Sequence, residues 1–153
     1  MADTINVNQK LSDWVANLHR SIDLLDKDRK EELMKPAGAS CAAGILSRCE
    51  SYLGKEIKTV EDLIFGWNLL RERNSLSGGW QVEEGGTIRG IFGECGCSLV
   101  RSGLIELHPV QCYCSLSMIT AVFSKVANRM VKVEIVQSRG RGDAVCEFLI
   151  TAK

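Results

Sequence analysis

A chain of 153 residues is most simply one domain, and it is long enough to bury a hydrophobic core. Hydrophobic residues make up 45% and charged residues 25% of the chain, which is ordinary for a globular protein. The 19 basic and 19 acidic residues cancel. This balance argues against a nucleic-acid-binding domain and against electrostatic docking on anionic lipid.

The chain begins with MADTINVNQKLSDW, which lacks the basic and apolar segments of a secretory signal. No run approaches the roughly 20 apolar residues that a membrane helix needs. We therefore expect a cytoplasmic protein. In that reducing compartment, clustered cysteines bind metal or carry out redox chemistry more often than they form structural disulfides.

The first half of the chain, residues 1–76, is mainly helical in pattern. A first helix is expected over residues 10–20, where apolar side chains recur at helical spacing. A second, short helix should end before Pro36, because a residue that precedes proline disfavours the helical conformation.

Two longer helices are expected next. Ser40 would cap the first of them, which has Cys41 in its first turn and ends at Gly54. Thr59 would cap the second, which fades at Asn74.

The second half, residues 77–153, changes to the alternation that is typical of strands. Two antiparallel pairs are expected, over residues 80–83 with 87–93 and residues 131–135 with 145–150. A helix capped by Ser115 would separate the pairs. The sequence thus predicts an α+β fold in a single domain, residues 1–153. N-terminal helices pack on an antiparallel sheet, and a further helix precedes a C-terminal β-hairpin.

Four of the seven cysteines lie between residues 93 and 115. They form two C-x-C pairs, Cys95-Gly-Cys97 and Cys112-Tyr-Cys114. Zinc binds four sulfurs tetrahedrally at about 2.3 Å, and a C-x-C pair on a strand can direct both sulfurs at one ion if the strand bends. Gly96 permits such a bend in the first pair. The pattern indicates a metal site without matching the usual C-x₂-C knuckle.

Two arrangements of the metal ligands are open. Either Cys95, Cys97, Cys112 and Cys114 close a structural site, or only some of them bind. In the second case Cys41, His108 or Cys146 would complete the shell, and one position would stay open. Zinc is the expected metal, and an iron–sulfur cluster also fits thiolate ligands. Redox-active thiols and a sulfur-lined core without a ligand are the alternatives.

From Cys112 onward, the segments CYCS and VKVEIVQSRGRGDAVCEFLI resemble the vinyl-reductase-type, hydrocarbon-binding domains. They similarly resemble the L-2-amino-thiazoline-4-carboxylate hydrolase-like proteins. A strand with a serine, a Gly-Asp hairpin and a C-x-F-x-I strand recur there, here Ser138, Gly142-Asp143 and Cys146 to Ile150. Gly38-x-x-Cys41 would place the chain in a cysteine-rich branch. The resemblance implies an α+β fold, a small-molecule pocket, frequent dimers and, in some members, zinc bound by cysteines.

We therefore expect a sensor-like domain that binds a small molecule or a metal, without a nucleic-acid or membrane partner and as a homodimer. The alternatives are a metal-dependent hydrolase of a small cyclic amidine or amide, and a thiol redox protein. No H-E-x-x-H or G-x-S-x-G motif is present. His108 is the candidate catalytic residue, because histidine exchanges protons near neutrality. Whether the protein is an enzyme stays open. The ligand that we expect is small and largely apolar or thiol-containing.

Overall fold

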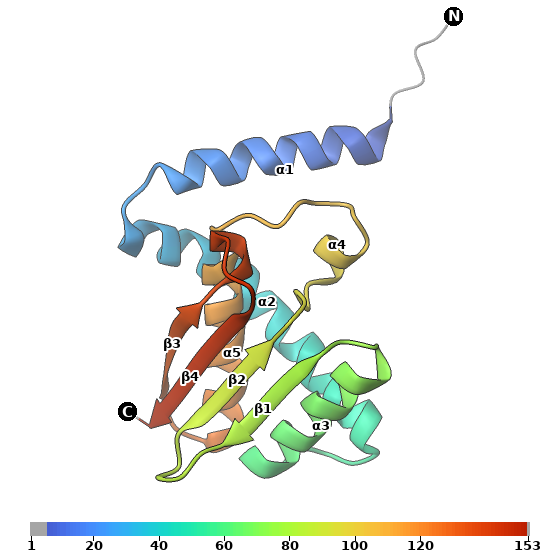
Figure 1. The fold of residues 1–153 in the computed structure, drawn as a ribbon, viewed down its shortest axis with the longest axis vertical. Helices are drawn as coiled ribbons and strands as arrows, with labels where there is room; N and C mark the ends of the chain where they lie inside the picture. Colours follow the sequence, from blue (N-terminus) through green and yellow to red (C-terminus); the bar gives the residue numbers. More distant parts are fainter. Residues whose placement is uncertain (1–5, 153) are drawn as a thin grey trace, which may run out of the picture.

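The computed structural model describes residues 6–152, which form helices packed against one antiparallel sheet (Figure 1). The helices are α1 (Val7–Asp23), α2 (Lys27–Leu53), α3 (Val60–Arg73), α4 (Ser98–Arg101), α5 (Gln111–Ala127) and the 3₁₀ turn η1 (Arg139–Arg141). The strands are β1 (Gly78–Val82), β2 (Ile88–Phe92), β3 (Val131–Gln137) and β4 (Cys146–Ala152). They form a four-stranded sheet in the order β1-β2-β4-β3. The α+β prediction is confirmed, including helix α5 before the β3–β4 hairpin.

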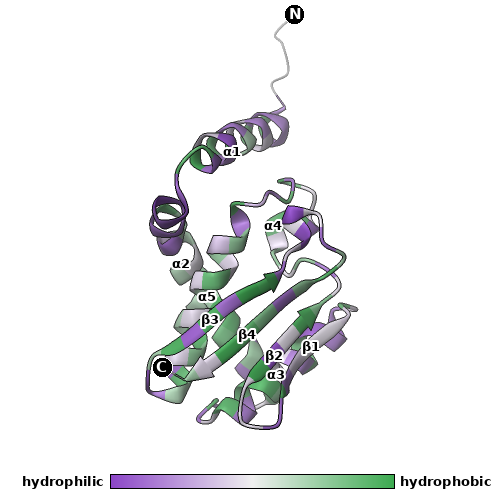
Figure 2. Ribbon diagram, turned by 60° about the vertical axis from the view of Figure 1, so that its left-hand side comes forward, coloured by the Kyte–Doolittle hydropathy of each residue, from purple (hydrophilic) through white to green (hydrophobic). Residues whose placement is uncertain are grey.

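One face of the sheet carries the core. Trp80, Gly90 and Phe148 are paired across β1, β2 and β4, and all three are buried. Phe123 of α5 packs edge-on against Trp80, with 5.0 Å between the ring centroids. The side chains of β3 alternate between hydrophobic and hydrophilic (Figure 2), because only one face of the strand meets the helices.

The opposite face of the sheet is polar. Arg89 bonds the carboxylates of both Glu83 and Glu147, and Gln137 donates to Glu147 at 3.0 Å. Glu147 is 8% exposed, so these bonds satisfy a charge that would otherwise be costly to bury.

Helix α2 corrects the prediction of a break at Pro36. The helix runs for 27 residues with Pro36 inside it, and Ser40 donates to the carbonyl of Ala37 within the helix. Pro36 lies on the exposed side, where water can reach the carbonyl that the proline leaves without a donor. Ser40 is therefore not a cap, and Cys41 lies in the middle of a helix.

Packing against α5 explains why α2 continues past the proline. Gly38 is buried where the two helices meet, and a Cβ built there would lie 2.8 Å from the Cβ of Ser117. It would lie still closer to the carbonyl oxygen of Cys114. Gly38 thus allows the two backbones to approach closely, which a turn at this point would prevent.

Helix α5 begins at Gln111, and the prediction that Ser115 caps it is wrong. Pro109 supplies a fixed φ near the start of the first turn, and the carbonyl of Pro109 accepts from the amide of Cys112 at 3.1 Å. The side chain of Gln111 reaches back and accepts from the amide of His108 at 2.7 Å. Cys112 and Cys114 therefore lie on a helix, while Cys95 and Cys97 lie in the loop after β2.

Helix α1 lies apart from the sheet (Figure 1). Leu11, Trp14 and Leu18, which share the apolar face expected from the sequence, are 42%, 63% and 43% exposed. Ile22 at the end of α1 packs against the cluster around Met34. No helix within residues 6–152 has the length and apolar character of a membrane span. A single domain over residues 1–153 stays a prediction.

Candidate functional site

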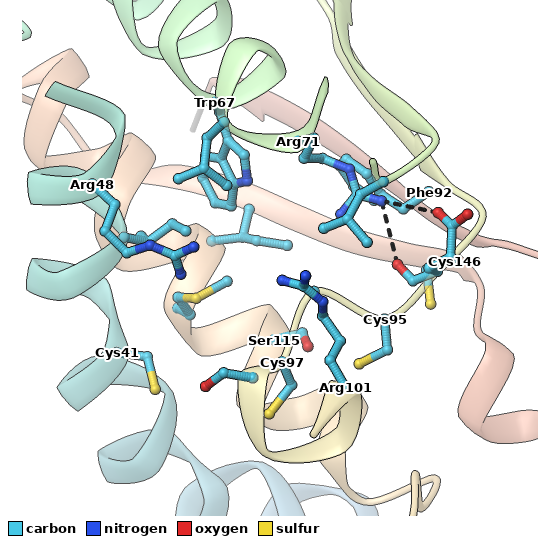
Figure 3. Close-up of a pocket in the computed structure, with 18 of the residues that line it drawn as sticks. Cys41, Arg48, Trp67, Arg71, Phe92, Cys95, Cys97, Arg101, Ser115 and Cys146 are labelled. Atoms are coloured by element: carbon cyan, nitrogen blue, oxygen red, sulfur yellow. Dashed lines mark hydrogen bonds and ion pairs between the residues drawn. The ribbon is translucent and has the colours of Figure 1, made fainter. Parts of the chain in front are cut away.

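A cavity of about 310 Å³ lies between the inner face of the sheet and helices α2, α3 and α5, and the loop before α4 borders it (Figure 3). For comparison, an apolar cavity of about 150 Å³ holds benzene in another protein. This cavity therefore has room for an aromatic ring with substituents, and its size falls within the usual range of small-molecule sites.

The deep end of the cavity is aromatic. It is formed by four buried side chains: Trp67, Trp80, Phe92 and Phe148. Trp67 and Phe92 each meet Trp80 edge-on, at centroid distances of 5.5 Å and 5.0 Å. Edge-to-face contacts of this kind fix the ring orientations, so this end offers a rigid apolar wall to a ligand.

The outer end of the cavity is polar. Cys41, Gly44 and Arg48 line it from one face of α2, as the helical spacing of three and four residues requires. Arg101 of α4 approaches from the other side, and its guanidinium and that of Arg48 both extend toward the middle of the cavity (Figure 3). Cys41, Arg48 and Arg101 are exposed, so this end is the opening to solvent.

Between the two ends lies a charge pair of the buried Arg71 and the exposed Glu94. Arg71 is 4% exposed, donates to the carbonyl oxygens of Ser77 and Glu94, and lies 3.7 Å from the Glu94 carboxylate. Its guanidinium also lies 4.5 Å from the centroid of the Phe92 ring. Burial lowers the pKa of Arg71, and the charge of Glu94 opposes that shift. Hydrogen bonds from the side chain and amide of Ser77 lower the pKa of Glu94, which therefore stays charged.

The cysteines of the first C-x-C pair reach this cavity. Cys95 and Cys97 line it, together with Cys41 from α2 and Cys146 from β4. Cys146 also packs against the core on the same sheet face as Phe148. Burial raises the pKa of the Cys95 thiol. Thiols from three separate parts of the chain thus line one cavity.

The second C-x-C pair is divided, because residues two apart on a helix point about 200° away from each other. The Cys112 sulfur lies 2.5 Å from the hydroxyl oxygen of Ser138, and burial raises the pKa of this thiol. Burial and then the neighbouring Cys41 raise the pKa of Cys114 to about 11, with Cys97 and Cys95 contributing less. Cys112 therefore faces Ser138, whereas Cys114 packs against the cluster around Met34 and is not among the residues that line the cavity.

Within residues 6–152, no three or more His, Cys, Asp or Glu side chains are placed so that they could hold a metal ion. A metal would also have to displace protons from thiols whose pKa values are raised. The side chains as placed therefore do not form a ready-made metal site, and zinc or iron–sulfur binding by Cys95, Cys97, Cys112 and Cys114 stays a prediction.

His108 lies away from the large cavity. It borders a smaller cavity of about 60 Å³ together with His19 of α1, and the two imidazole centroids are 5.5 Å apart. The Nδ1 atom of His108 accepts from the amide of Val110 at 3.2 Å, so this histidine orients the start of α5. Its assignment as a catalytic residue stays a prediction.

Sequence reasoning missed the three arginines that line the cavity: Arg48, Arg71 and Arg101. One signal was available for Arg48, which lies seven residues after Cys41 and so falls on the same helix face. The positions of Arg71 and Arg101 depend on how α3 and α4 meet the end of the sheet, which no local pattern reveals.

Neither a protein-family model nor a curated protein matches this sequence. The structure is similar to an H-NOX protein from S. oneidensis in the Fe(II)NO ligation state, with a TM-score of 0.53 and 14% identity over 80% of this chain. The match covers 65% of that protein, which is less than two thirds of its length.

The structure is also similar to the phenol-responsive sensory domain of the transcription activator PoxR with phenol. The TM-score is 0.54 and the identity 11%, and the match covers 90% of this chain and 73% of that one. At such low identity both likenesses show the fold alone. The resemblance of residues 112–153 to the vinyl-reductase-type and thiazoline-hydrolase-like families stays a prediction.

Proposed function

We propose that this chain is a sensor-like domain that binds a small, largely apolar molecule in the large cavity. The observation that carries the proposal is the cavity itself, which has an aromatic deep end and opens to solvent between α2 and α4. The fold is that of a phenol-responsive sensory domain and an H-NOX protein, which supports the same conclusion by analogy.

Binding without turnover suits this lining better than catalysis. Proton transfer needs a free acid or base within reach of the reacting atom. Glu94 is the carboxylate in the lining, and its Oε2 already accepts from Ser77 at 2.7 Å and 2.8 Å. No histidine is among the described residues that line the cavity. The alternative is hydrolysis of a cyclic amidine or amide, and turnover of such compounds that is lost in His108→Ala would establish it.

Tryptophan fluorescence tests the binding proposal directly. Two of the three tryptophans, Trp67 and Trp80, line the cavity, while Trp14 is exposed on α1. In a Trp14→Phe background, saturable quenching by phenol or 3-phenylpropan-1-ol would therefore report on the cavity. We expect such quenching.

A matched pair of variants on α2 locates the binding. Gly44 lines the cavity, and a Cβ added to it would meet no atom within 4 Å, so Gly44→Leu should fill the opening without a clash. The exposed neighbour Ala43 does not line the cavity, and Ala43→Leu is the control. We expect the first variant to lose binding and the second to keep it. Equal binding by both would place the ligand elsewhere and refute the proposal.

Metal binding is a second proposal. Its support is that Cys41, Cys95 and Cys97 line one cavity and that Cys114 is close enough to all three for their charges to raise its pKa. Rotation of these side chains would bring thiolates together around a zinc ion, because thiolate is a ligand that zinc prefers.

Elemental analysis of protein purified without oxygen or chelator tests the metal proposal. About one zinc or iron per chain supports it, and much less counts against it. Loss of metal in Cys97→Ser and Cys114→Ser but not in Cys112→Ser would indicate a site on the cavity side. Loss in all three would indicate the four cysteines of the two pairs.

A homodimer is also proposed, as the family resemblance implies. The exposed apolar face of α1, with Trp14 and Leu18, is compatible with such an association. Sedimentation equilibrium of the chain and of Trp14→Glu tests it.

A further inference from the structure

The lining of the large cavity carries an excess of positive charge. Arg48, Arg71 and Arg101 line it, against the single carboxylate of Glu94. Guanidinium groups keep their charge at any ordinary pH, and the raised pKa of Cys95 keeps this thiol of the lining neutral. The charges in the lining therefore do not balance.

The carboxylate of Glu94 does not neutralise the outer arginines. It accepts two hydrogen bonds from Ser77 and lies 3.7 Å from Arg71. None of the ion pairs within residues 6–152 includes Arg48 or Arg101. These two arginines come from different helices, and their guanidinium groups extend into the same space (Figure 3). The charge of Arg101 also lowers the pKa of Arg71, so the positive groups act on one another.

Two buried donors in the same lining also lack acceptors. The Nε atom of Arg71 and the Nε1 atom of Trp80 have no hydrogen-bond partner among the described residues, although the two side chains are only 4% and 3% exposed. A buried donor without an acceptor is destabilising, because it has lost its hydrogen bonds to water. Both atoms can only donate, so a hydrogen-bond acceptor on a ligand, or a water molecule, would satisfy them.

We infer that the ligand of this cavity is an aromatic or apolar carboxylate. Its apolar body packs against Trp67, Trp80 and Phe148, and Arg48 and Arg101 bind its carboxylate at the opening. The inference rests on the proposed function and adds the chemical class of the ligand. Carboxylate oxygens satisfy guanidinium donors in bidentate geometry, and their charge compensates the excess at the opening. Arg48 and Arg101 are then specificity-determining residues.

Calorimetry with matched ligands tests the inference. The pair 3-phenylpropionate and 3-phenylpropan-1-ol share the ring and the chain and differ in charge. We expect the carboxylate to bind at least about tenfold more tightly at low salt, since one charge-assisted hydrogen bond is worth about that factor. The difference should shrink as salt is added, because both arginines are exposed.

Variants of the arginines complete the test. Arg48→Gln and Arg101→Gln should each weaken binding of 3-phenylpropionate by about tenfold or more and leave binding of the alcohol unchanged. The control is Arg73→Gln, because Arg73 is exposed near the end of α3 and does not line the cavity. It should change neither affinity.

The outcomes separate the inference from the proposed function. Equal affinity for acid and alcohol, both lost in Gly44→Leu, would overturn the inference and leave a neutral-ligand sensor. A preference for the acid that survives Arg48→Gln and Arg101→Gln, alone and combined, would also overturn it. If neither compound, nor phenol, bound to the unaltered chain, the proposed function would fail together with the inference.

Discussion

The two glycines at positions 38 and 44 of α2 offer a direct measurement of how closely α2 and α5 pack. Gly38 and Gly44 both lie inside this 27-residue helix, and neither has a positive φ. A Cβ at Gly44 would meet no atom within 4 Å, whereas a Cβ at Gly38 would lie 2.8 Å from the Cβ of Ser117 and 3.0 Å from the amide nitrogen of Met118.

The expected energies follow from these contacts. Replacing an interior helical glycine by alanine stabilises a helix by about 1 kcal/mol, and both substitutions share this gain. Gly44→Ala should therefore raise the free energy of unfolding by about that amount. Gly38→Ala must also push α5 away, because the nearest atoms include its backbone, which cannot rotate aside. Overpacking of this kind costs about 1–3 kcal/mol, or more where backbone must move.

The difference between the two variants isolates the strain, because the shared propensity gain cancels. We expect Gly38→Ala to be less stable than Gly44→Ala by about 1–3 kcal/mol or more. In a chain of this size that corresponds to a melting temperature lower by roughly 2–12 °C. Urea unfolding followed by circular dichroism measures both free energies. If the two variants were equally stable, the conclusion that α2 and α5 approach each other closely at Gly38 would be wrong.

Three further predictions concern titration and burial. Burial, and then His108, lower the pKa of His19 below 6.5, so unfolding takes up a proton. The stability that neutral His19 contributes should be present above pH 6.5 and decline as the pH falls below it. The protection factors of the α1 amides, which correct for the pH dependence of intrinsic exchange, should fall accordingly but stay constant in His19→Phe. In alkylation followed by mass spectrometry, exposed Cys41 should react first. Cys49 and Cys114, whose burial raises their pKa to about 12 and about 11, should react last, and early labelling of Cys49 would contradict its burial. Cys146→Ser should destabilise the chain by about 1–3 kcal/mol, because a hydroxyl replaces a sulfur that packs against the core. The metal content should not change. Loss of metal in a variant that is still folded would instead make Cys146 a ligand.

The α+β class and the strand pairs could be predicted because they depend on local periodicity. Gly85-Gly86 forms the turn between β1 and β2, and both glycines have positive φ, as a tight hairpin between alternating segments requires. Pro36 misled the prediction because the contact that keeps α2 helical is made by Gly38 with α5, far along the chain. Local rules for proline contain no information about such a contact.

The candidate site was predicted less completely, for a related reason. The C-x-C spacing marked Cys95 and Cys97, which do line the cavity. The spacing could not indicate Arg71 and Arg101, because these side chains reach the cavity only through the packing of α3 and α4 against the sheet. A sequence does not show whether a charged residue forms an ion pair. Here the informative fact is that Arg101 takes part in none of the ion pairs of the described residues.

Secondary structure decides what a C-x-C pair can do. On a strand, residues two apart point to the same side, and the pair can serve one site. On a helix they point nearly opposite ways, so Cys112 meets Ser138 of the hairpin while Cys114 packs against the cluster around Met34. Because the second pair lies on helix α5, its two sulfurs cannot both face one site as the strand prediction required, and Cys41 of α2 lines the cavity with Cys95 and Cys97. A metal or oxidant that joined Cys41 to Cys95 or Cys97 would therefore link α2 to the loop before α4, and both elements border the cavity.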